Sequence, residues 1–278
     1  MAGSNPHSSP KSMQERVWTG LLYVSSALVL AFLTAPVLAI VPLSFNSGQF
    51  LTYPLQGLSL RWYEEFFTDP AWTRSLWNSL YIGAVSTLLA TILGTMAALG
   101  LTRADFPGKT AVAAILLSPI VVPLVITAVG VYFFFAQFNL NATYTGLILV
   151  QTALGAPFVV ITVSATLRGY DTTLSRAAAS LGAGPLTTFF RVTLPLIGPG
   201  VASGALFAFA TSFDEVVVVL LVGGPEQRTL PREMFSGIRE NISPTIIAAA
   251  TILIVVAAAL LAVLELLRRR NERLRGQA

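Results

Sequence analysis

Six long apolar stretches constrain this chain more than any other feature of its sequence. A transmembrane helix needs about 20 predominantly apolar residues to cross about 30 Å of hydrocarbon. Lipid offers no partner for free backbone N–H and C=O groups, so each stretch is expected to be helical. We expect spans at 18–43, 76–101, 110–138, 144–167, 198–222 and 244–267. The sequence therefore predicts an all-α integral membrane protein with six transmembrane helices.

Composition supports this class and argues against others. Charged residues make up only 11% of the chain, whereas soluble domains average about 25%. The chain has no cysteine, and its single histidine, His7, lies in a polar tail. These counts argue against a disulfide framework, a metal centre or a histidine-based catalytic apparatus. Pro119 and Pro123 in the third stretch, and Pro157 in the fourth, are expected to kink helices without ending them.

The distribution of basic residues predicts the orientation. Loops rich in Lys and Arg stay in the cytoplasm. With both termini inside, the cytoplasmic side holds 12 of the 17 basic residues. These are Lys11, Arg16, Arg103, Lys109, Arg168, Arg176, Arg191, Arg268, Arg269, Arg270, Arg273 and Arg275. We therefore expect a disordered cytoplasmic tail at 1–17, a permease domain at 18–267 and a basic cytoplasmic tail at 268–278. The first span exceeds the apolar region of about 7–15 residues in a signal peptide, so we expect it to be retained.

The sequence does not support nucleic-acid binding, which its basic character suggests, or ATP hydrolysis, which a local motif suggests. The pI of about 9.7 is explained by topology, since no nucleic-acid-binding motif accompanies it. Gly108-Lys109-Thr110 looks like the end of a phosphate-binding loop. That motif requires a glycine five positions before Gly108, and Arg103 stands there. We therefore expect no ATP hydrolysis, and no enzyme activity, in this chain.

The polar segment 168–197 separates two apolar stretches on the basic side. Asp171 and Thr172 can cap a helix, which we place at 172–181. Gly182 suits the left-handed position after a helix, and Pro185 suits the start of a second helix, running to about 192. Pro195 and Pro199 are then expected to break the chain before the fifth span. The competing interpretation is an amphipathic helix on the membrane surface.

This segment resembles the coupling loop of the permease subunits of ABC importers. In that family Glu-Ala-Ala is followed at fixed spacing by Gly and then by Ile-x-Leu-Pro. The loop reads RAAASLGAGPLTTFFRVTLP, with Val192 at the Ile position and Arg176 at the Glu position. The resemblance implies ATPase-coupling roles for Arg176, Ala177, Ala178, Gly182, Leu194 and Pro195. Arg176 implies that the polarity of the ATPase contact is altered.

The likeness extends over roughly 70–275 and is greatest to the spermidine/putrescine branch of these permeases. The segment 194–225 reads LPLIGPGVASGALFAFATSFDEVVVVLLVGGP, and SPTIIAAATILIV follows at 243–255. The resemblance implies a type I (MetI-like) permease fold in a bacterial inner membrane. It also implies two ATPase subunits that bind ATP and Mg²⁺, a second homologous permease and a substrate-binding protein. No cofactor in this chain and no nucleic-acid partner is expected.

Asp214 and Glu215 are the candidate residues of a substrate path. Ionisable groups inside an apolar stretch are costly and usually face a bundle interior or a water-filled cavity. A carboxylate there could meet an organic cation, so we expect a polyamine substrate, with Asp214 more than Glu215 facing the path. The pair could instead be a structural gate element. Another small organic solute, such as an opine, an aminophosphonate or an amino-acid-like compound, also remains open.

Weaker features complete the sequence-based picture. Asn78 and Gln151 are further polar candidates, and Gly200, Gly204 and Ala208 form a small-residue stripe suited to helix packing. The outer segment 44–75 is rich in aromatic residues, and 223–243 contains a possible amphipathic helix around 233–239. A stand-alone secondary transporter or channel, or a membrane scaffold without transport, is the alternative of a different class.

The topology can be tested directly, because the chain has no cysteine to remove. A single cysteine added near the C-terminus is expected to react with a membrane-impermeant thiol reagent only after the cells are opened. A cysteine in the outer segment 44–75 should react in intact cells and serves as the control. Labelling of the C-terminal cysteine in intact cells would contradict the positive-inside argument.

Overall fold

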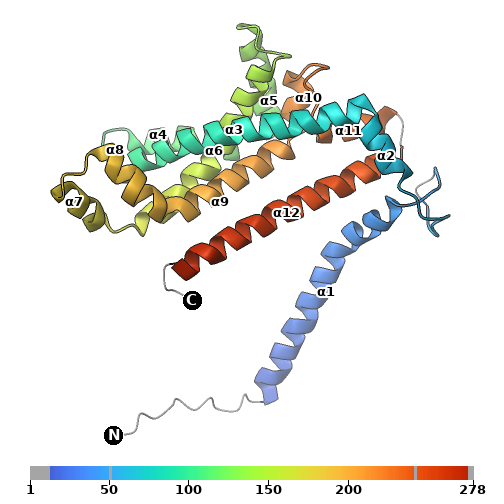
Figure 1. The fold of residues 1–278 in the computed structure, drawn as a ribbon, viewed down its shortest axis with the longest axis horizontal. Helices are drawn as coiled ribbons and strands as arrows, with labels where there is room; N and C mark the ends of the chain where they lie inside the picture. The colour runs from blue at the N-terminus through green and yellow to red at the C-terminus, as the bar shows by residue number, and fades with distance from the viewer. Residues whose placement is uncertain (1–12, 50–51, 241–242, 275–278) are drawn as a thin grey trace.

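The computed structural model describes residues 13–49, 52–240 and 243–274, and Figure 1 shows their arrangement. Within these ranges the chain is helical apart from turns and a single isolated bridge between Asn46 and Leu58. The elements are α1 (Met13–Leu43), α2 (Arg61–Thr68), α3 (Pro70–Arg103), α4 (Lys109–Val121), α5 (Leu124–Ala136), α6 (Tyr144–Arg168), α7 (Thr172–Ser180), α8 (Pro185–Thr188), η1 (Phe189–Thr193), α9 (Leu194–Phe213), α10 (Val217–Val222), α11 (Leu230–Glu240) and α12 (Thr245–Leu274).

The predicted all-α membrane fold is confirmed. Among the described residues, five helical segments are long and apolar enough to span a membrane, and the number is six when one bent pair of helices is counted as a single span. The expected kinked helix at 110–138 is wrong in detail, because the chain breaks between α4 and α5 and bends there by 108°. Val122 is extended there, with φ −72° and ψ 131°. A proline disfavours helical geometry in the residue before it, so Pro123 explains why α4 ends at Val121.

The expected helix at 198–222 is also wrong. α9 ends at Phe213, and α10 begins only at Val217. The acidic pair therefore lies in the break between two helices and not within a continuous span. At the other end, the break expected at Pro195 and Pro199 is absent, because the helical segment Pro185–Phe213 is continuous.

A wide helical turn explains how the chain passes through these prolines. η1 is a five-residue π-helix that ends immediately before α9. The ring of a proline in a helix clashes with the carbonyl of the residue four positions earlier, which for Pro195 is Arg191. Arg191 lies inside η1, where the turn is wider. The coupling segment is thus joined to the membrane helix without an intervening loop.

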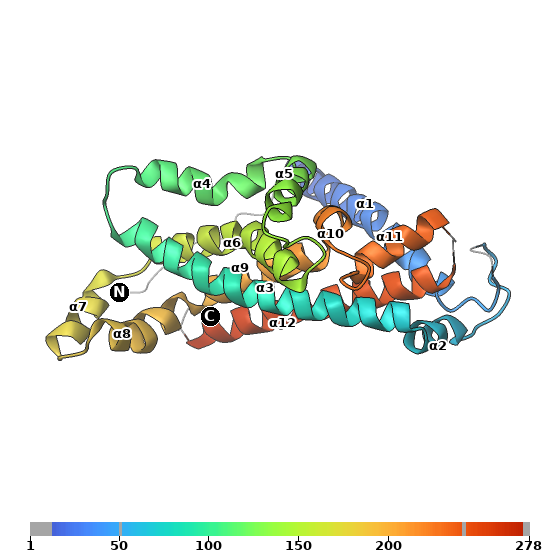
Figure 2. The same cartoon turned by 90° about the horizontal axis from the view of Figure 1, so that it is seen from above.

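The core of the bundle is the contact of α3, α6 and α9, which Figure 2 shows side by side. Small residues let these backbones approach closely. A Cβ atom on Gly204 would lie 2.8 Å from Cα of Val159, and one on Gly155 would lie 3.0 Å from Cβ of Ala208. On α3, a Cβ on Gly94 would lie 2.7 Å from Cβ of Val159. The prediction that the small-residue stripe is buried is confirmed, and the helix that covers it is α6 of the same chain.

Two elements extend beyond this core. α1 lies apart from the bundle in Figure 1, and none of its span is buried, against 61% for α6. Its outer end is held by hydrogen bonds such as Tyr53 Oη to Ala39 O, at 2.7 Å. Some outer aromatics form a second core instead of an interfacial belt, because Phe66 and Trp72 pack with Leu230 of the predicted amphipathic helix, now α11. Of the tail expected at 1–17, residues 1–12 lie outside the described residues and 13–17 begin α1. Of the tail expected at 268–278, residues 268–274 end α12 and 275–278 lie outside the described residues.

Gly204→Leu is expected to destabilise the bundle, because a side chain there meets the backbone of α6. Overpacking typically costs about 1–3 kcal/mol, which is a measurable fall in the thermal transition of the detergent-purified protein. Gly198→Leu is the matched control on the same helix, since a Cβ atom there meets nothing within 4 Å. Equal transition temperatures for the two variants would show that the α6–α9 contact is not tightly packed.

Candidate functional site: a coupling loop and an acidic cavity

α7 and α8 project from one end of the bundle, opposite the end that carries α2 (Figures 1 and 2). The local signals in the sequence explain their shape. Asp171 caps α7, with Oδ1 accepting a hydrogen bond from Thr173 N at 2.9 Å. Hydrogen bonds from the Thr173 side chain and backbone hold the pKa of the Asp171 carboxyl below its usual value. Gly182 has φ +84°, and Pro185 begins α8, as predicted.

The six residues assigned to coupling fall into two groups. Arg176, Ala177 and Gly182 are exposed on α7 and the turn after it, and Ala178 is half-buried. Leu194 and Pro195 instead lie at the start of α9, where Leu194 packs against the α6–α9 core. The first group can contact a soluble partner, whereas the second joins the loop to the membrane helix.

Sequence reasoning missed part of this surface. Leu181 is 89% exposed and Leu186 is 75% exposed, on either side of the Gly182 turn. They could have been found from the sequence, because they are apolar residues that flank a helix-ending glycine in a polar loop. Together with the exposed alanines they give the knob formed by 172–188 an apolar tip, which suits a helix-in-groove contact.

Asp214 and Glu215 have different environments. Asp214 is the C-cap residue that follows α9, with φ −92° and ψ −1°, and it is exposed. Glu215 is only 5% exposed. Its Oε1 accepts a hydrogen bond from Val218 N at 2.9 Å, so it caps the start of α10. Glu215 therefore has a local structural role, and Asp214 is the carboxylate that is free to face a solute.

Both carboxylates border a cavity of about 570 Å³. The two helix breaks meet here, because the lining comes from the α4–α5 junction, from α6 and from the α9–α10 junction. The lining residues are Pro119, Ile120, Leu124, Leu154, Phe158, Ala210, Thr211, Asp214, Glu215, Val216 and Val217. Apolar walls around a few polar groups are typical of small-molecule sites.

The charge of this cavity can be estimated from its parts. A helix end carries about half a unit charge, negative at the C-terminus and positive at the N-terminus. The C-terminal ends of α4 and α9 and the N-terminal ends of α5 and α10 all border the cavity, so their contributions oppose each other. Within the described ranges, the ion pairs are Lys109–Asp105 and Arg228–Glu233, and neither involves Asp214. The carboxylate of Asp214 therefore leaves the cavity negative.

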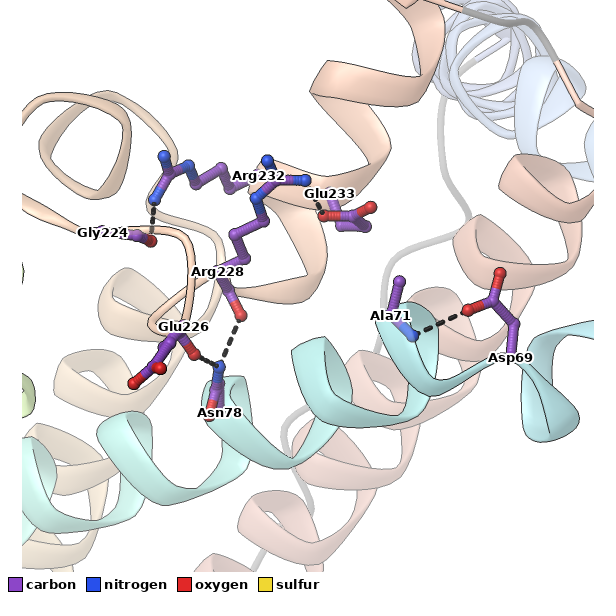
Figure 3. A network of polar contacts seen from close by, with 8 residues as sticks. All are labelled: Asp69, Ala71, Asn78, Gly224, Glu226, Arg228, Arg232 and Glu233. Atoms are coloured by element: carbon purple, nitrogen blue, oxygen red, sulfur yellow. Dashed lines mark hydrogen bonds and ion pairs between the residues drawn. The ribbon is translucent and has the colours of Figure 1, made fainter.

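The other two polar candidates are separated from this cavity. Asn78 lies on α3 at the outer end, where Figure 3 shows it below the loop after α10. Its Nδ2 donates to Glu226 O at 2.7 Å and to Arg228 O at 2.9 Å, and its Oδ1 accepts from Tyr144 Oη at 2.9 Å. Gln151 is fully buried in α6. Asn78 thus anchors an outer loop, and neither residue lines the acidic cavity.

The same outer loop is held from its other side. Arg232 donates to Gly224 O at 2.8 Å, and Arg228 pairs with Glu233 at 3.2 Å (Figure 3). The backbone N–H of Leu230 also donates to Ser79 Oγ at 2.7 Å. These contacts position α11 toward the end of the bundle opposite α7 and α8 (Figure 1). Among the described residues, no group of three His, Cys, Asp or Glu side chains could hold a metal ion.

Comparison with known proteins identifies the class that this geometry defines. Residues 90–273 match the family described as "Binding-protein-dependent transport system inner membrane component". The chain belongs to this family, so it is a multi-pass inner-membrane permease component rather than an ATPase. The predicted ABC importer permease is therefore confirmed.

Individual relatives indicate which branch of the family this chain resembles. The chain is 37% identical to the putrescine transport system permease protein PotI of Escherichia coli (strain K12) over 224 residues, 78% of this chain and 79% of the relative. It is 33% identical to the spermidine/putrescine transport system permease protein PotC of Haemophilus influenzae over 245 residues, 88% and 95% of the two chains. The resemblance to the spermidine/putrescine branch is thus confirmed.

Solved structures share the fold. A bacterial ABC transporter for the import of alginate superposes with a TM-score of 0.73 at 14% identity, over 94% of this chain and 99% of that chain. The MetNI methionine ABC transporter gives a TM-score of 0.58 at 20% identity, over 72% and 95%. These matches confirm the MetI-like permease fold.

Proposed function

We propose that this chain is the permease subunit of an ATP-driven importer and that it forms the path for a polyamine such as putrescine or spermidine. The observation that carries the proposal is Asp214, an exposed carboxylate without an ion pair in the described chain, at a cavity where two helices break. A protonated polyamine is a flexible chain of methylenes with ammonium groups. Apolar walls with one carboxylate suit both parts of such a molecule, and the names of the relatives point to the same solutes.

The partners follow from the two ends of the bundle. We assign the knob 172–188 to an ATPase subunit that binds ATP and Mg²⁺, and the outer face around α11 to a substrate-binding protein. A second homologous permease would complete the path, and two ATPase subunits would bind on the cytoplasmic side. In this proposal both termini are cytoplasmic, in agreement with the tendency of Lys- and Arg-rich segments to stay inside. In this proposal ATP hydrolysis belongs wholly to the partner subunits.

The function is tested by reconstituting the complex with its ATPase, second permease and binding protein in liposomes. Uptake of radiolabelled putrescine is expected to require ATP and the binding protein, and to be inhibited by spermidine. Uptake without ATPase subunits would favour the alternative of a secondary transporter or channel. ATP-dependent uptake of an opine or an aminophosphonate but not of putrescine would support the assignment as an importer and contradict the polyamine substrate.

Asp214→Asn is expected to reduce putrescine uptake while the complex still assembles. Two unit charges about 4 Å apart interact by about 1 kcal/mol in water and about 4 kcal/mol near a protein surface. The loss should therefore be at least about fivefold, and Glu215→Gln, which retains a cap acceptor, should lose less. Asp105→Asn, in a distant loop, is the charge-matched control. Wild-type uptake by Asp214→Asn would identify the acidic pair as a structural gate element.

Gly182→Val is expected to uncouple ATP hydrolysis from transport. A β-branched residue at φ +84° is strained by about 1–3 kcal/mol, so the turn that aims α7 should distort. Gly184→Val is the matched control, since Gly184 has φ −66° and also has open space around its Cβ position. Arg176→Glu, the family's usual residue, should be tolerated better than Gly182→Val. Normal coupling in reconstituted Gly182→Val would contradict the assigned role of the knob.

A further inference from the structure

Tyr170 lies at the junction between the membrane bundle and the coupling loop. It follows the last turn of α6 and precedes Asp171, the cap of α7. Its side chain is half-buried and packs against the core cluster that includes Leu167 and Ile197. Its hydroxyl group lies within hydrogen-bond distance of Ser175 in the loop. One side chain thus contacts both the membrane core and the loop proposed to bind the ATPase.

The tyrosine hydroxyl has two hydroxyl neighbours from different elements. It lies 2.6 Å from Ser175 Oγ of α7 and 3.5 Å from Thr193 Oγ1 at the end of η1. Thr193 is fully buried. The short first distance is that of a good O–H···O hydrogen bond. The hydroxyl therefore joins α7 to the turn that leads into α9.

Arg103 adds the third helix. Its guanidinium carbon lies 5.6 Å from the centre of the Tyr170 ring, within cation–π range. One of its nitrogens donates to Thr193 Oγ1 at 3.2 Å. Arg103 is the last residue of α3. The cytoplasmic ends of α3, α6 and α9 are thus linked through Tyr170 and Thr193.

Within the described part of the chain, α7 has no other side-chain hydrogen bond to a residue outside the segment 171–180. No residue of α7 is buried. The other side-chain hydrogen bonds recorded for it are local: Asp171 caps Thr173, and Ser180 Oγ donates to Arg176 O at 3.1 Å. A displacement of α7 by a soluble partner would therefore reach the bundle through the backbone, through the packing of α7 against α8 and η1, and through the hydrogen bond of Ser175.

We propose that Tyr170, anchored by Arg103 and Thr193, is the positioning residue that transmits movement of α7 to the membrane helices through its hydrogen bond with Ser175. The proposal rests on the proposed function, since it requires an ATPase that moves α7. Without the hydroxyl contact, α7 still binds the ATPase by its exposed face. Its movement is then absorbed by the loop and is not passed to α3 and α9.

The test measures molecules of putrescine imported per ATP hydrolysed by the reconstituted complex. Tyr170→Phe removes the hydroxyl but keeps the ring over Arg103, and Ser175→Ala removes the other partner. Each is expected to lower this ratio roughly two- to tenfold, the range that one hydrogen bond provides, with ATP hydrolysis maintained. Ser180→Ala is the matched control on the same helix, because the hydrogen bond it removes is local.

The double variant Tyr170→Phe/Ser175→Ala decides whether the two residues act as one link. It is expected to be no worse than either single variant, because both remove the same bond. Ser175→Thr, which keeps a hydroxyl, should restore most of the ratio. Arg103→Ala should also lower the ratio, whereas Lys109→Ala, in the adjacent turn, should not.

The results separate this proposal from the proposed function. If the wild-type complex imports no putrescine on ATP hydrolysis, the proposed function is wrong. If the wild type couples normally and Tyr170→Phe and Ser175→Ala keep its ratio, only the link is wrong. Losses that multiply in the double variant would also overturn the link, because they would show that the two hydroxyls act independently.

Discussion

The close approach of α3, α6 and α9 is the constraint on which the other features depend. Hydrophobicity cannot hold helices together inside lipid, so packing of small residues must do so. Gly94 of α3 and Gly204 of α9 both approach Val159 of α6, and Gly155 of α6 approaches Ala208 of α9. The packed bundle then fixes the positions of the elements attached to its two ends. Tyr170 and Leu194 rest on the end that carries the coupling loop, and Asn78 holds the loop after α10 at the other end.

The bundle also explains why two helices can break at mid-length. Irregular backbone inside a membrane is tolerated only where protein or a water-filled cavity surrounds it. Both breaks, after Val121 and after Phe213, border the same cavity. At the second break, the side chain of Glu215 satisfies a freed backbone group by capping α10. Asp214 is left without such a task, and a carboxylate in that position gives the cavity its charge. Discontinuous helices that meet at a binding site occur in other transporter folds.

Much of the fold and the loop could be predicted from local patterns. Apolar runs located the membrane helices, and Asp171, Gly182 and Pro185 predicted the ends of α7 and α8, because capping and left-handed turns depend on neighbouring residues. The helix breaks could not be predicted in the same way. Pro123 ends a helix whereas Pro199 lies inside one, and the difference depends on tertiary packing. Hydropathy likewise joined 198–222 into one span, because it does not register that Glu215 caps a new helix. The Tyr170–Arg103 contact joins residues far apart in sequence and leaves no local signal.

The central claim is that Asp214 makes the cavity between the broken helices attractive to cations. Thr211 lines this cavity, and the chain has no cysteine, so Thr211→Cys places one thiol beside the carboxylate. The decisive measurement is the rate at which this thiol reacts with a positively charged methanethiosulfonate reagent and with a negatively charged one, each relative to its rate with a free thiol. We expect the cationic reagent to react faster, and we expect Asp214→Asn to remove most of that preference. Equal relative rates, or a faster anionic reagent, in the protein that retains Asp214 would contradict the account.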